Sequence, residues 1–209
     1  MATISGIFVL MLVVATVVPA NATFTEIQVA SWDVMYINFE YGSHTGGYAG
    51  EITVSLRDDV DGWGDLQAAF CVDLDSDIYK DRTYTIETML QPAPIEVAWL
   101  MDTYSSPTAS SVSGAALQSG IWEVLYADKF NLTGPLGVTE LYDAYMVALG
   151  DATIETDYLL SNYSVVSING YQNLLVQNSS SAPVPEPTTM LLFGAGLIGL
   201  AGVGRKKIK

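Results

Sequence analysis

Three kinds of side chain are scarce in this chain of 209 residues, which holds one cysteine, one histidine and eight lysines or arginines. Four of the basic residues stand in the last five positions. Between the two apolar ends, the chain therefore has four basic residues against 23 acidic ones, a formal charge of 4 − 23 = −19. A surface of this charge repels nucleic acid, which excludes a nucleic-acid-binding function, and it attracts cationic partners.

The scarcity of histidine and cysteine also limits the catalytic and metal-binding chemistry that the protein can perform. His44 stands in the glycine-rich stretch Tyr41–Gly50 without a cysteine or a clear acid partner near it in sequence, so we expect it in a surface loop. The chain shows no nucleophile elbow, no His-rich metal box and no catalytic-triad spacing. The sequence therefore predicts that the protein is not an enzyme, and a secreted hydrolase is the least favoured alternative.

Asp73, Asp75 and Asp77 resemble the start of a calcium-binding loop. The pattern then fails, because Ile78 stands where the loop needs glycine and Tyr84 stands where it needs a bidentate glutamate. An EF-hand is therefore excluded. The three aspartates remain candidates for an irregular Ca²⁺ site, the alternative being solvated acidic turns, and no other cofactor is predicted.

The first 22 residues predict a secretory signal peptide. Ile7–Val18 is an apolar run of the length found in such signals, and Ala20 and Ala22 supply the small residues of a cleavage site. Cleavage after Ala22 leaves Thr23 as the first residue of the mature chain. The alternative is an N-terminal membrane anchor, for which the run is short.

The C-terminal end predicts a membrane-processing signal. Its parts are a polar linker (178–187) ending in Pro185-Glu186-Pro187, an apolar segment (188–204), and a basic tail (205–209) with Arg205, Lys206 and Lys207. The apolar segment is long enough to cross a thin bilayer as a helix. Positive residues favour the cytoplasmic side, so we expect the body, residues 23–177, outside the membrane. A plain tail anchor or a buried helix is the alternative.

These three parts, in this order, resemble the PEP-CTERM sorting signal of Gram-negative bacteria over residues 184–209. The resemblance implies export, transient anchoring in the membrane, and cleavage near Pro185–Pro187 by a processing enzyme of the exosortase type. Bacteria with this signal usually make exopolysaccharide and a biofilm matrix, so the resemblance also implies a location on the cell surface or in the matrix. It does not define the function of the body.

The body alternates apolar and polar residues in segments that predict strands, and its middle part predicts helices. Strands are expected at Glu26–Phe39, Glu51–Arg57, Ala68–Leu74 and Thr83–Glu87, and two more within Tyr158–Val176 around a turn at Asn169-Gly170; helices are expected at Pro94–Tyr104, Gly114–Tyr126 and Thr139–Leu149. This order predicts an α+β domain, a mostly-β sandwich or barrel with a helical insertion.

Gly114–Tyr126 is the segment around which the chain is organised. Its large apolar residues form one stripe at 100° per residue, with Gln118 at the rim of the stripe beside Trp122, while Ser119 and Glu123 face water. A buried glutamine is costly unless its carbonyl and its N–H bonds find partners. We therefore expect a neutral amide that is pressed against the core.

Cys71 gives this amide a candidate function. A free thiol outside the cell oxidises or pairs with another chain unless it is protected. Attack of the Cys71 thiolate on the Gln118 carboxamide expels ammonia and leaves a thioester, if the two groups touch, water is excluded and donors face the carbonyl oxygen. Phe70 and Trp122 flank the two residues and are expected to shield the bond.

The same residues carry a resemblance to a known class of domain. Phe70-Cys71-Val72-Asp73 and the segment Leu117–Trp122, LQSGIW, resemble the aromatic-Cys and Leu-Gln-x-x-Ile-Trp motifs of bacterial thioester domains, and 118 − 71 = 47 residues separate Cys71 from Gln118. Those domains are adhesins. The resemblance implies covalent attachment to a target through Cys71 and Gln118.

Two functions remain open. The first is a surface or matrix adhesin that uses a Cys71–Gln118 thioester once, on an amine or hydroxyl of a surface protein or exopolysaccharide. The second is a structural matrix protein that associates with exopolysaccharide without covalent chemistry. In that case Cys71 is an ordinary buried thiol and Gln118 hydrogen-bonds across a helix–sheet interface.

Overall fold

The computed structural model describes residues 24–59, 61–90, 92–106 and 110–178. The chain divides into two units, a body of Thr23–Ser181 and a second unit made of Met1–Ala22 and Ala182–Lys209. The predicted signal peptide, sorting helix and basic tail lie outside the described residues, as does the linker beyond Asn178. In the described part of the chain, no helix is long and apolar enough to cross a membrane.

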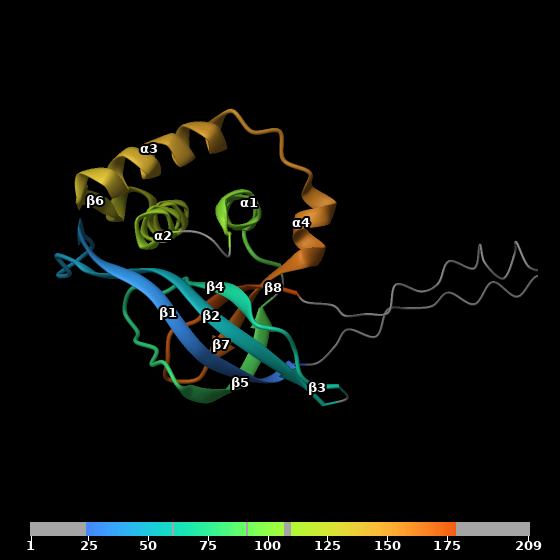
Figure 1. Cartoon of the computed structure of the whole chain (residues 1–209). Coiled ribbons are helices and arrows are strands. Elements are labelled where there is room, and N and C mark those ends of the chain that lie inside the picture. Colours follow the sequence, from blue (N-terminus) through green and yellow to red (C-terminus); the bar gives the residue numbers. More distant parts are fainter. Residues whose placement is uncertain (1–23, 60, 91, 107–109, 179–209) are drawn as a thin grey trace, which may run out of the picture. The chain divides into compact units, whose positions relative to one another are not determined.

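The described residues form an α+β body, which confirms the predicted class (Figure 1). The strands are β1 (Phe24–Glu40), β2 (Gly47–Asp58), β3 (Gly62–Trp63), β4 (Gln67–Cys71), β5 (Arg82–Leu90), β6 (Asn131–Gly134), β7 (Tyr163–Ile168) and β8 (Leu174–Gln177). The helices are α1 (Ile95–Tyr104), α2 (Ser111–Tyr126), α3 (Leu136–Gly150) and α4 (Thr156–Asn162), with a 3₁₀ turn η1 (Ala127–Lys129) after α2.

Six of the strands form a closed antiparallel ring. β2 pairs with β4, β4 with β8, β8 with β7, β7 with β5, and β5 with β1, and β1 pairs again with β2. The short strands β3 and β6 attach to β2 and β1. The strand pairing therefore follows the barrel alternative of the predicted architecture, and closure leaves the ring without a free edge.

Alternate residues of the ring strands face opposite sides, because successive side chains of a strand point to opposite faces. Every ring strand contributes to one buried cluster, which fills the interior of the ring: Ile27 and Val29, Ile52 and Val54, Ala69 and Cys71, Tyr84, Val166 and Ile168, and Leu174 and Val176. Phe70 of β4 and Leu175 of β8, which lie between these residues, belong to a second cluster with Val72 and with α1, α2 and α4. Helices therefore cover the outer face of the wall that β4, β8 and β7 form.

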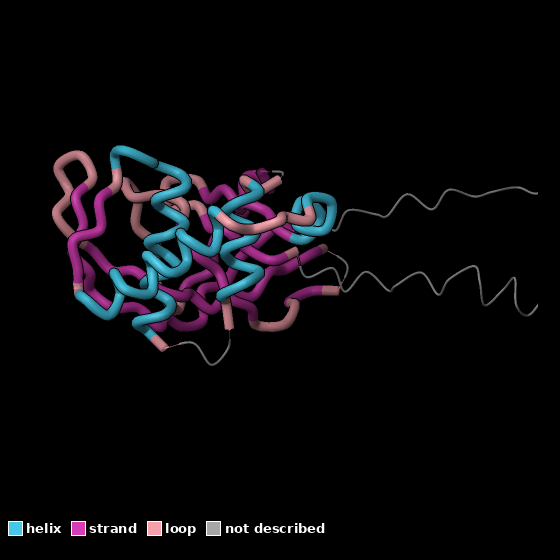
Figure 2. The backbone as a smooth tube through the Cα atoms, turned by 90° about the horizontal axis from the view of Figure 1, so that it is seen from above, coloured by secondary structure: helices cyan, strands magenta, loops and turns pink. Residues whose placement is uncertain are grey.

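Helix α2 lies in the middle of the helical layer, between α1 and α3, and also packs on β1 and β2 (Figures 1 and 2). Its start is fixed by a capping box, in which Ser110 accepts from the Ser113 N–H at 3.2 Å and Ser113 accepts from the Ser110 N–H at 2.9 Å. Every residue from Gly114 to Trp122 is buried. The helix thus has protein on all sides along most of its length.

The expectation that Ser119 faces water is therefore wrong. Its side chain is fully buried, and its hydroxyl donates to the Ala115 carbonyl at 2.8 Å. An apolar stripe along one side of a helix predicts that the opposite side faces water only when the helix packs on one side alone. Here α1 and α3 cover the side that the sheet leaves open.

Some boundaries also differ from the prediction. β4 ends at Cys71 instead of Leu74, α4 occupies the start of the segment expected to be a strand from Tyr158, and β2 begins inside the glycine-rich stretch. β3 and β6 were not expected. These elements are short, so strands and helices far away in sequence decide their form more than local propensity does. The turn at Asn169-Gly170 is confirmed, with Gly170 at φ 74°.

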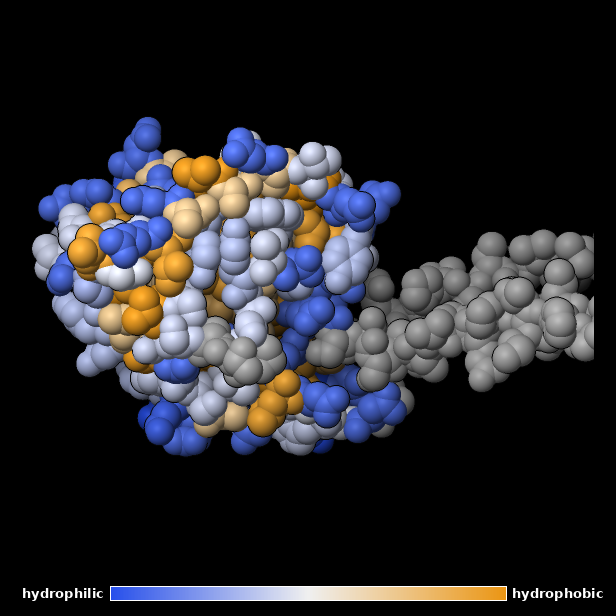
Figure 3. Space-filling model, turned by 45° about the horizontal axis from the view of Figure 1, so that its top comes forward, coloured by the Kyte–Doolittle hydropathy of each residue, from blue (hydrophilic) through white to orange (hydrophobic). Residues whose placement is uncertain are grey.

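Helix α3 is the outermost helix of the layer. Its residues are half-buried or exposed, apart from Val138, the only one that is fully enclosed within the described chain. Leu136 and Val147 of this helix are exposed. Figure 3 shows hydrophobic side chains interspersed with hydrophilic ones on this side of the body. Helix α3 therefore covers α2 and shields the interface between α2 and the barrel.

Two glycines of α2 offer a matched test of this packing. A Cβ at Gly120 would meet side chains at ordinary distance, 3.5 Å from Met146 Sδ and 3.6 Å from Leu100 Cδ1, whereas a Cβ at Gly114 would lie 3.2 Å from the Glu51 backbone nitrogen. We expect Gly120→Ala to raise the free energy of unfolding by about 0.5–1 kcal/mol through helix propensity. Gly114→Ala should gain less or lose stability. Denaturant titration of both variants checks this, and a Gly114→Ala protein at least as stable as Gly120→Ala would contradict the close approach of α2 to β2.

Candidate functional site

The backbone of Cys71 lies where one strand pairing ends. β4 pairs with β2 only as far as Ala69, opposite Ile52. On its other side β4 continues along β8, where the Val72 N–H donates to the Asn173 carbonyl at 3.0 Å. Successive residues of an antiparallel strand direct their N–H and C=O to opposite neighbours. The Cys71 N–H and C=O therefore point to the side on which β2 no longer supplies a partner.

Gln118 of α2 supplies that partner with its side chain. The Cys71 N–H donates to Gln118 Oε1 at 2.9 Å, and Gln118 Nε2 donates to the Cys71 carbonyl at 2.6 Å. The carboxamide thus takes the place of a β2 peptide group at the end of β4. Gln118 is only 1% exposed, so the expected burial of this amide with partnered polar groups is confirmed.

The sulfur of Cys71 contacts a residue that the sequence analysis did not identify. The Cys71 thiol donates to Gln172 Oε1, with 2.8 Å between Sγ and the oxygen. Gln172 follows the turn between β7 and β8 and stands 101 residues away in sequence. No local pattern marks it, because only the pairing of β8 with β4, Cys71 opposite Leu174, brings it to the sulfur.

Burial controls the protonation of the thiol. Cys71 is 9% exposed, and desolvation raises the pKa of its thiol far above the ordinary value, with a smaller contribution from the Asp73 carboxylate. The thiolate is the nucleophilic and oxidisable form of cysteine. A free Cys71 is therefore a neutral thiol at physiological pH, in keeping with its role as hydrogen-bond donor to Gln172.

The two aromatic residues expected to shield the site lie in different clusters. Trp122 belongs to the cluster that contains Cys71, where its ring centroid lies 5.6 Å from that of Phe39 and 5.8 Å from that of Phe130. Phe70 is fully buried in the cluster between the barrel wall and the helices. Both rings are buried, but the ring contacts of Trp122 are with Phe39 and Phe130.

The three aspartates that follow Cys71 take different partners. Asp73 Oδ2 accepts from the Asn173 N–H at 2.7 Å, Asp75 contacts His44, and the Asp77 backbone carbonyl accepts from the Gln172 N–H at 3.2 Å. Among residues 24–178 as far as they are described, no group of three or more His, Cys, Asp and Glu side chains is placed to hold a metal ion. These aspartates therefore do not converge on a Ca²⁺ ion.

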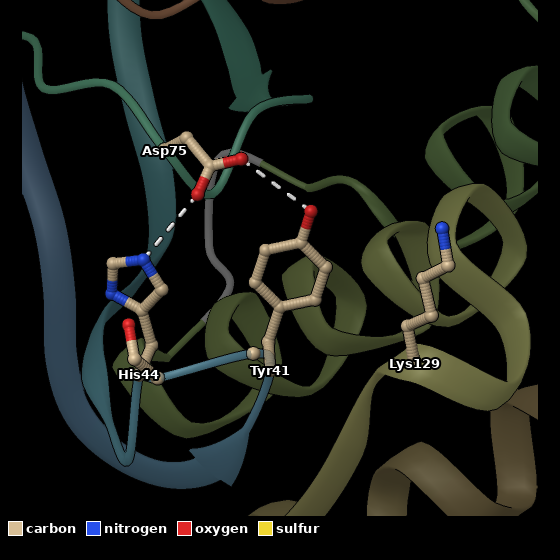
Figure 4. Close-up of a pocket in the computed structure, with 6 residues that line it drawn as sticks. Tyr41, His44, Asp75 and Lys129 are labelled. Carbon is tan, nitrogen blue, oxygen red and sulfur yellow. Dashed lines mark hydrogen bonds and ion pairs between the residues drawn. The ribbon is translucent and has the colours of Figure 1, made fainter.

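An open depression of about 450 Å³ lies beside this segment (Figure 4). Tyr41, His44, Asp75 and Lys129 line it. His44 is partly exposed in a loop, as expected, but it has an acid partner, because its Nε2 lies 3.3 Å from Asp75 Oδ1. The chain folds back to bring these two residues together, so their spacing in sequence did not reveal the contact.

The depression borders the strand end that carries Cys71. The ring of Tyr41 packs on Tyr126 with 4.7 Å between centroids, and the Tyr126 hydroxyl donates to the Val72 carbonyl at 3.0 Å. Desolvation raises the pKa of Tyr126 to about 12, so this hydroxyl remains a donor at physiological pH. Tyr126 thus separates the depression from the residue next to Cys71.

Comparison with known proteins identifies the C-terminal end of the chain. Residues 183–206 match the PEP-CTERM protein-sorting motif, which confirms the predicted sorting signal at Pro185-Glu186-Pro187 and the start of the basic tail, Arg205 and Lys206. Lys207 stands one residue beyond the match. The motif implies export, membrane-associated processing by an exosortase, and display at the cell surface. No curated protein and no solved structure matches the chain.

The double contact of Gln118 predicts a large effect of its removal. Gln118→Ala leaves the buried N–H and C=O of Cys71 without partners, and each such group costs about 1–3 kcal/mol. We expect the free energy of unfolding to fall by about 2–4 kcal/mol in denaturant titration. Gln177→Ala, which truncates an exposed glutamine at the end of β8, should change it by less than about 0.5 kcal/mol. Equal losses in the two variants would show that the Gln118 carboxamide does not complete the end of β4.

Proposed function

We propose that the protein is a cell-surface adhesin that attaches covalently to a partner through a thioester between Cys71 and Gln118. The observation that carries this proposal is the hydrogen bond from the Cys71 N–H to Gln118 Oε1. When a thiol adds to a carboxamide, negative charge develops on the carbonyl oxygen, and a backbone N–H aimed at that oxygen stabilises it. The backbone N–H of Cys71 thus serves as the oxyanion donor. The reaction requires that Sγ, which contacts Gln172 Oε1 in the structure, turn toward the carbonyl carbon of Gln118.

The proposed reaction balances without a cofactor. Cys71 Sγ bonds to the carbonyl carbon of Gln118, the bond from that carbon to Nε2 breaks, and the thiol proton leaves with the amine as ammonia. The Cys71 carbonyl already accepts a hydrogen bond from Nε2, so the departing group is held at 2.6 Å from a backbone acceptor. The raised pKa of the Cys71 thiol makes the attack slow. A bond that forms once in each molecule does not require a fast reaction.

The surroundings favour survival of the product. Gln118, Phe70 and Trp122 are all almost fully buried. Exclusion of water protects a reactive acyl group from hydrolysis. A partner amine would then take the acyl group of Gln118 as an amide and release the Cys71 thiol; a partner hydroxyl would form an ester in the same way.

Each molecule uses its thioester only once, so the protein is proposed to act as a single-use reagent and not as an enzyme. The sorting motif supports export and display of the body at the cell surface. We propose that the cell is a Gram-negative bacterium and that residues 188–204 anchor the body transiently. The partner would be a surface protein or an exopolysaccharide of a biofilm matrix. The acidic body, −19 between the apolar ends, favours approach to cationic amines.

The intact mass of the exported protein tests the bond directly. We expect a mass one ammonia below that calculated for the processed chain, and a shift to the mass of the methylamine adduct after incubation with methylamine. Cys71→Ala and Gln118→Ala should both show the full calculated mass and no adduct. A wild-type protein of full mass with one titratable thiol would refute the thioester.

The alternative is a structural matrix protein that associates with exopolysaccharide without a covalent bond. The depression lined by Tyr41, His44 and Lys129 favours it, because hydroxyl, imidazole and ammonium groups suit hydrogen bonding to sugar hydroxyls. The two functions are separated by measuring how much of the Cys71→Ala protein remains in the matrix of the cells that produce it. We expect denaturant to extract Cys71→Ala completely and to leave a bound fraction of the wild type. Equal extraction would favour the non-covalent function.

A further inference from the structure

The hairpin of β1 and β2 carries three aromatic residues on one of its faces. The two strands pair without a register shift from Ser31 onward, and Tyr48 of β2 stands directly opposite Tyr36 of β1. Trp32 precedes Tyr36 by four residues, so it points to the same side, because side chains alternate along a strand. We call these three residues, Trp32, Tyr36 and Tyr48, the aromatic stripe.

The rings of the aromatic stripe reach solvent. Trp32 is 38% exposed, Tyr36 is 55% exposed and Tyr48 is 70% exposed. The two tyrosine rings meet edge to face, with 5.6 Å between their centroids. Val34 and its partner Gly50, which lie between the aromatic residues on this face, have small side chains or none. At about 3.3 Å per residue, the stripe extends over roughly 13 Å from Trp32 to Tyr36.

Packing of the hairpin does not require this exposed stripe. The alternate residues Ile37 and Ala49 belong to the buried cluster that contains Ala115 of α2, so the hairpin contributes its other face to the core. A Cβ at Gly46 would lie only 2.6 Å from the hydroxyl oxygen of Tyr36. A glycine thus leaves room for an aromatic side chain that remains largely in solvent.

The charge and the size of the stripe restrict what can bind there. None of the side chains on this face between Trp32 and Tyr36, or opposite them on β2, is charged. The charge of −19 between the apolar ends repels nucleic acid, an anionic bilayer and a second copy of the chain. Three aromatic side chains of at most about 250 Å² each also offer less than the roughly 800 Å² that each partner buries in a stable protein complex. The stripe therefore suits a narrow, uncharged ligand.

The stripe is also remote from the point where the chain leaves the body. The described chain ends at Asn178, directly after β8, on the side of the body opposite the turn between β1 and β2 (Figure 1). The sorting motif, residues 183–206, follows this end in sequence. The connection to the sorting motif therefore starts on the other side of the body and leaves the stripe accessible to material outside the cell.

We propose that the aromatic stripe binds a chain of neutral sugar residues, so that the protein holds a neutral polysaccharide without a covalent bond. The face of an aromatic ring carries negative partial charge and attracts the C–H groups of a sugar ring. The hydroxyls of Tyr36 and Tyr48 can donate to sugar hydroxyls and accept from them. Because the stripe is longer than one sugar ring, Trp32 contacts a different sugar residue from the two tyrosines. This binding does not rest on the thioester.

Reversible binding is measured with the Cys71→Ala protein, in which no thioester can form. The probe is the neutral fraction of the polysaccharide from the matrix of the producing cells, separated from anionic polymers by anion exchange. Retardation in native gels that contain the probe gives an apparent dissociation constant. We expect retardation of Cys71→Ala, and binding weakened roughly three- to tenfold when Trp32→Ala or Tyr48→Ala is added. Tyr48→Phe, which keeps the ring, should stay within about twofold.

The matched controls are Trp63→Ala on β3 and Tyr158→Ala on α4, which remove aromatic side chains about as exposed as Trp32 and Tyr36. Both should bind the probe as tightly as the Cys71→Ala parent. Circular dichroism of each variant shows that it is folded. Should Cys71→Ala not fold, the same substitutions are compared in the wild-type chain after treatment with methylamine, which opens a thioester if one is present.

The proposal is wrong if the neutral fraction does not retard the parent protein, or if the stripe variants bind as tightly as Trp63→Ala and Tyr158→Ala. It is also wrong if only the anionic fraction binds, or if Lys129→Ala weakens binding and the stripe variants do not, which would place the sugar in the depression. The intact mass of the wild type decides the thioester separately, so failure of the proposed covalent function would leave this result unchanged.

Discussion

The backbone N–H and C=O groups at a buried strand end need hydrogen-bond partners. In this protein a side chain from the helical layer supplies them and so joins the helices to the barrel. The pairing of β2 with β4 ends at Ala69, two residues before Cys71, and the carboxamide of Gln118 takes over. A side chain can replace a strand only if the helix that carries it is held at a fixed height above the sheet. The position of α2, enclosed by α1, α3 and two strands, is therefore a condition for the site.

The small residues of α2 allow this enclosure. Gly114 brings the helix against the backbone of β2, and Gly120 brings it against side chains of α1 and α3. A helix that is surrounded in this way cannot shift along its axis without clashes, because protein interiors are close-packed. Gln118 lies between the two glycines, so its amide is delivered to Cys71 by packing on both sides of the helix.

The same strand end is held from the other side by the chain that enters β8. Gln172 and Asn173 bind the segment from Val72 to Asp77 through backbone and side-chain contacts. Cys71 is consequently placed between a buried amide from the helical layer and a half-buried amide from the barrel. The sulfur contacts the amide that enters β8, and the backbone of Cys71 contacts the amide from the helical layer.

The sequence by itself determined the α+β class, the approximate positions of the main strands and helices, the burial of Gln118 and the C-terminal sorting signal. These follow from local periodicity, from one polar residue at the rim of an apolar stripe, and from motifs in which neighbouring residues act together. The closure of the ring, the burial of Ser119, the contact of His44 with Asp75 and the approach of Gln172 to Cys71 were decided only by the tertiary structure. Each of these depends on segments between about 30 and 100 residues apart, or on helices that pack on both sides of another, and no local pattern encodes such encounters.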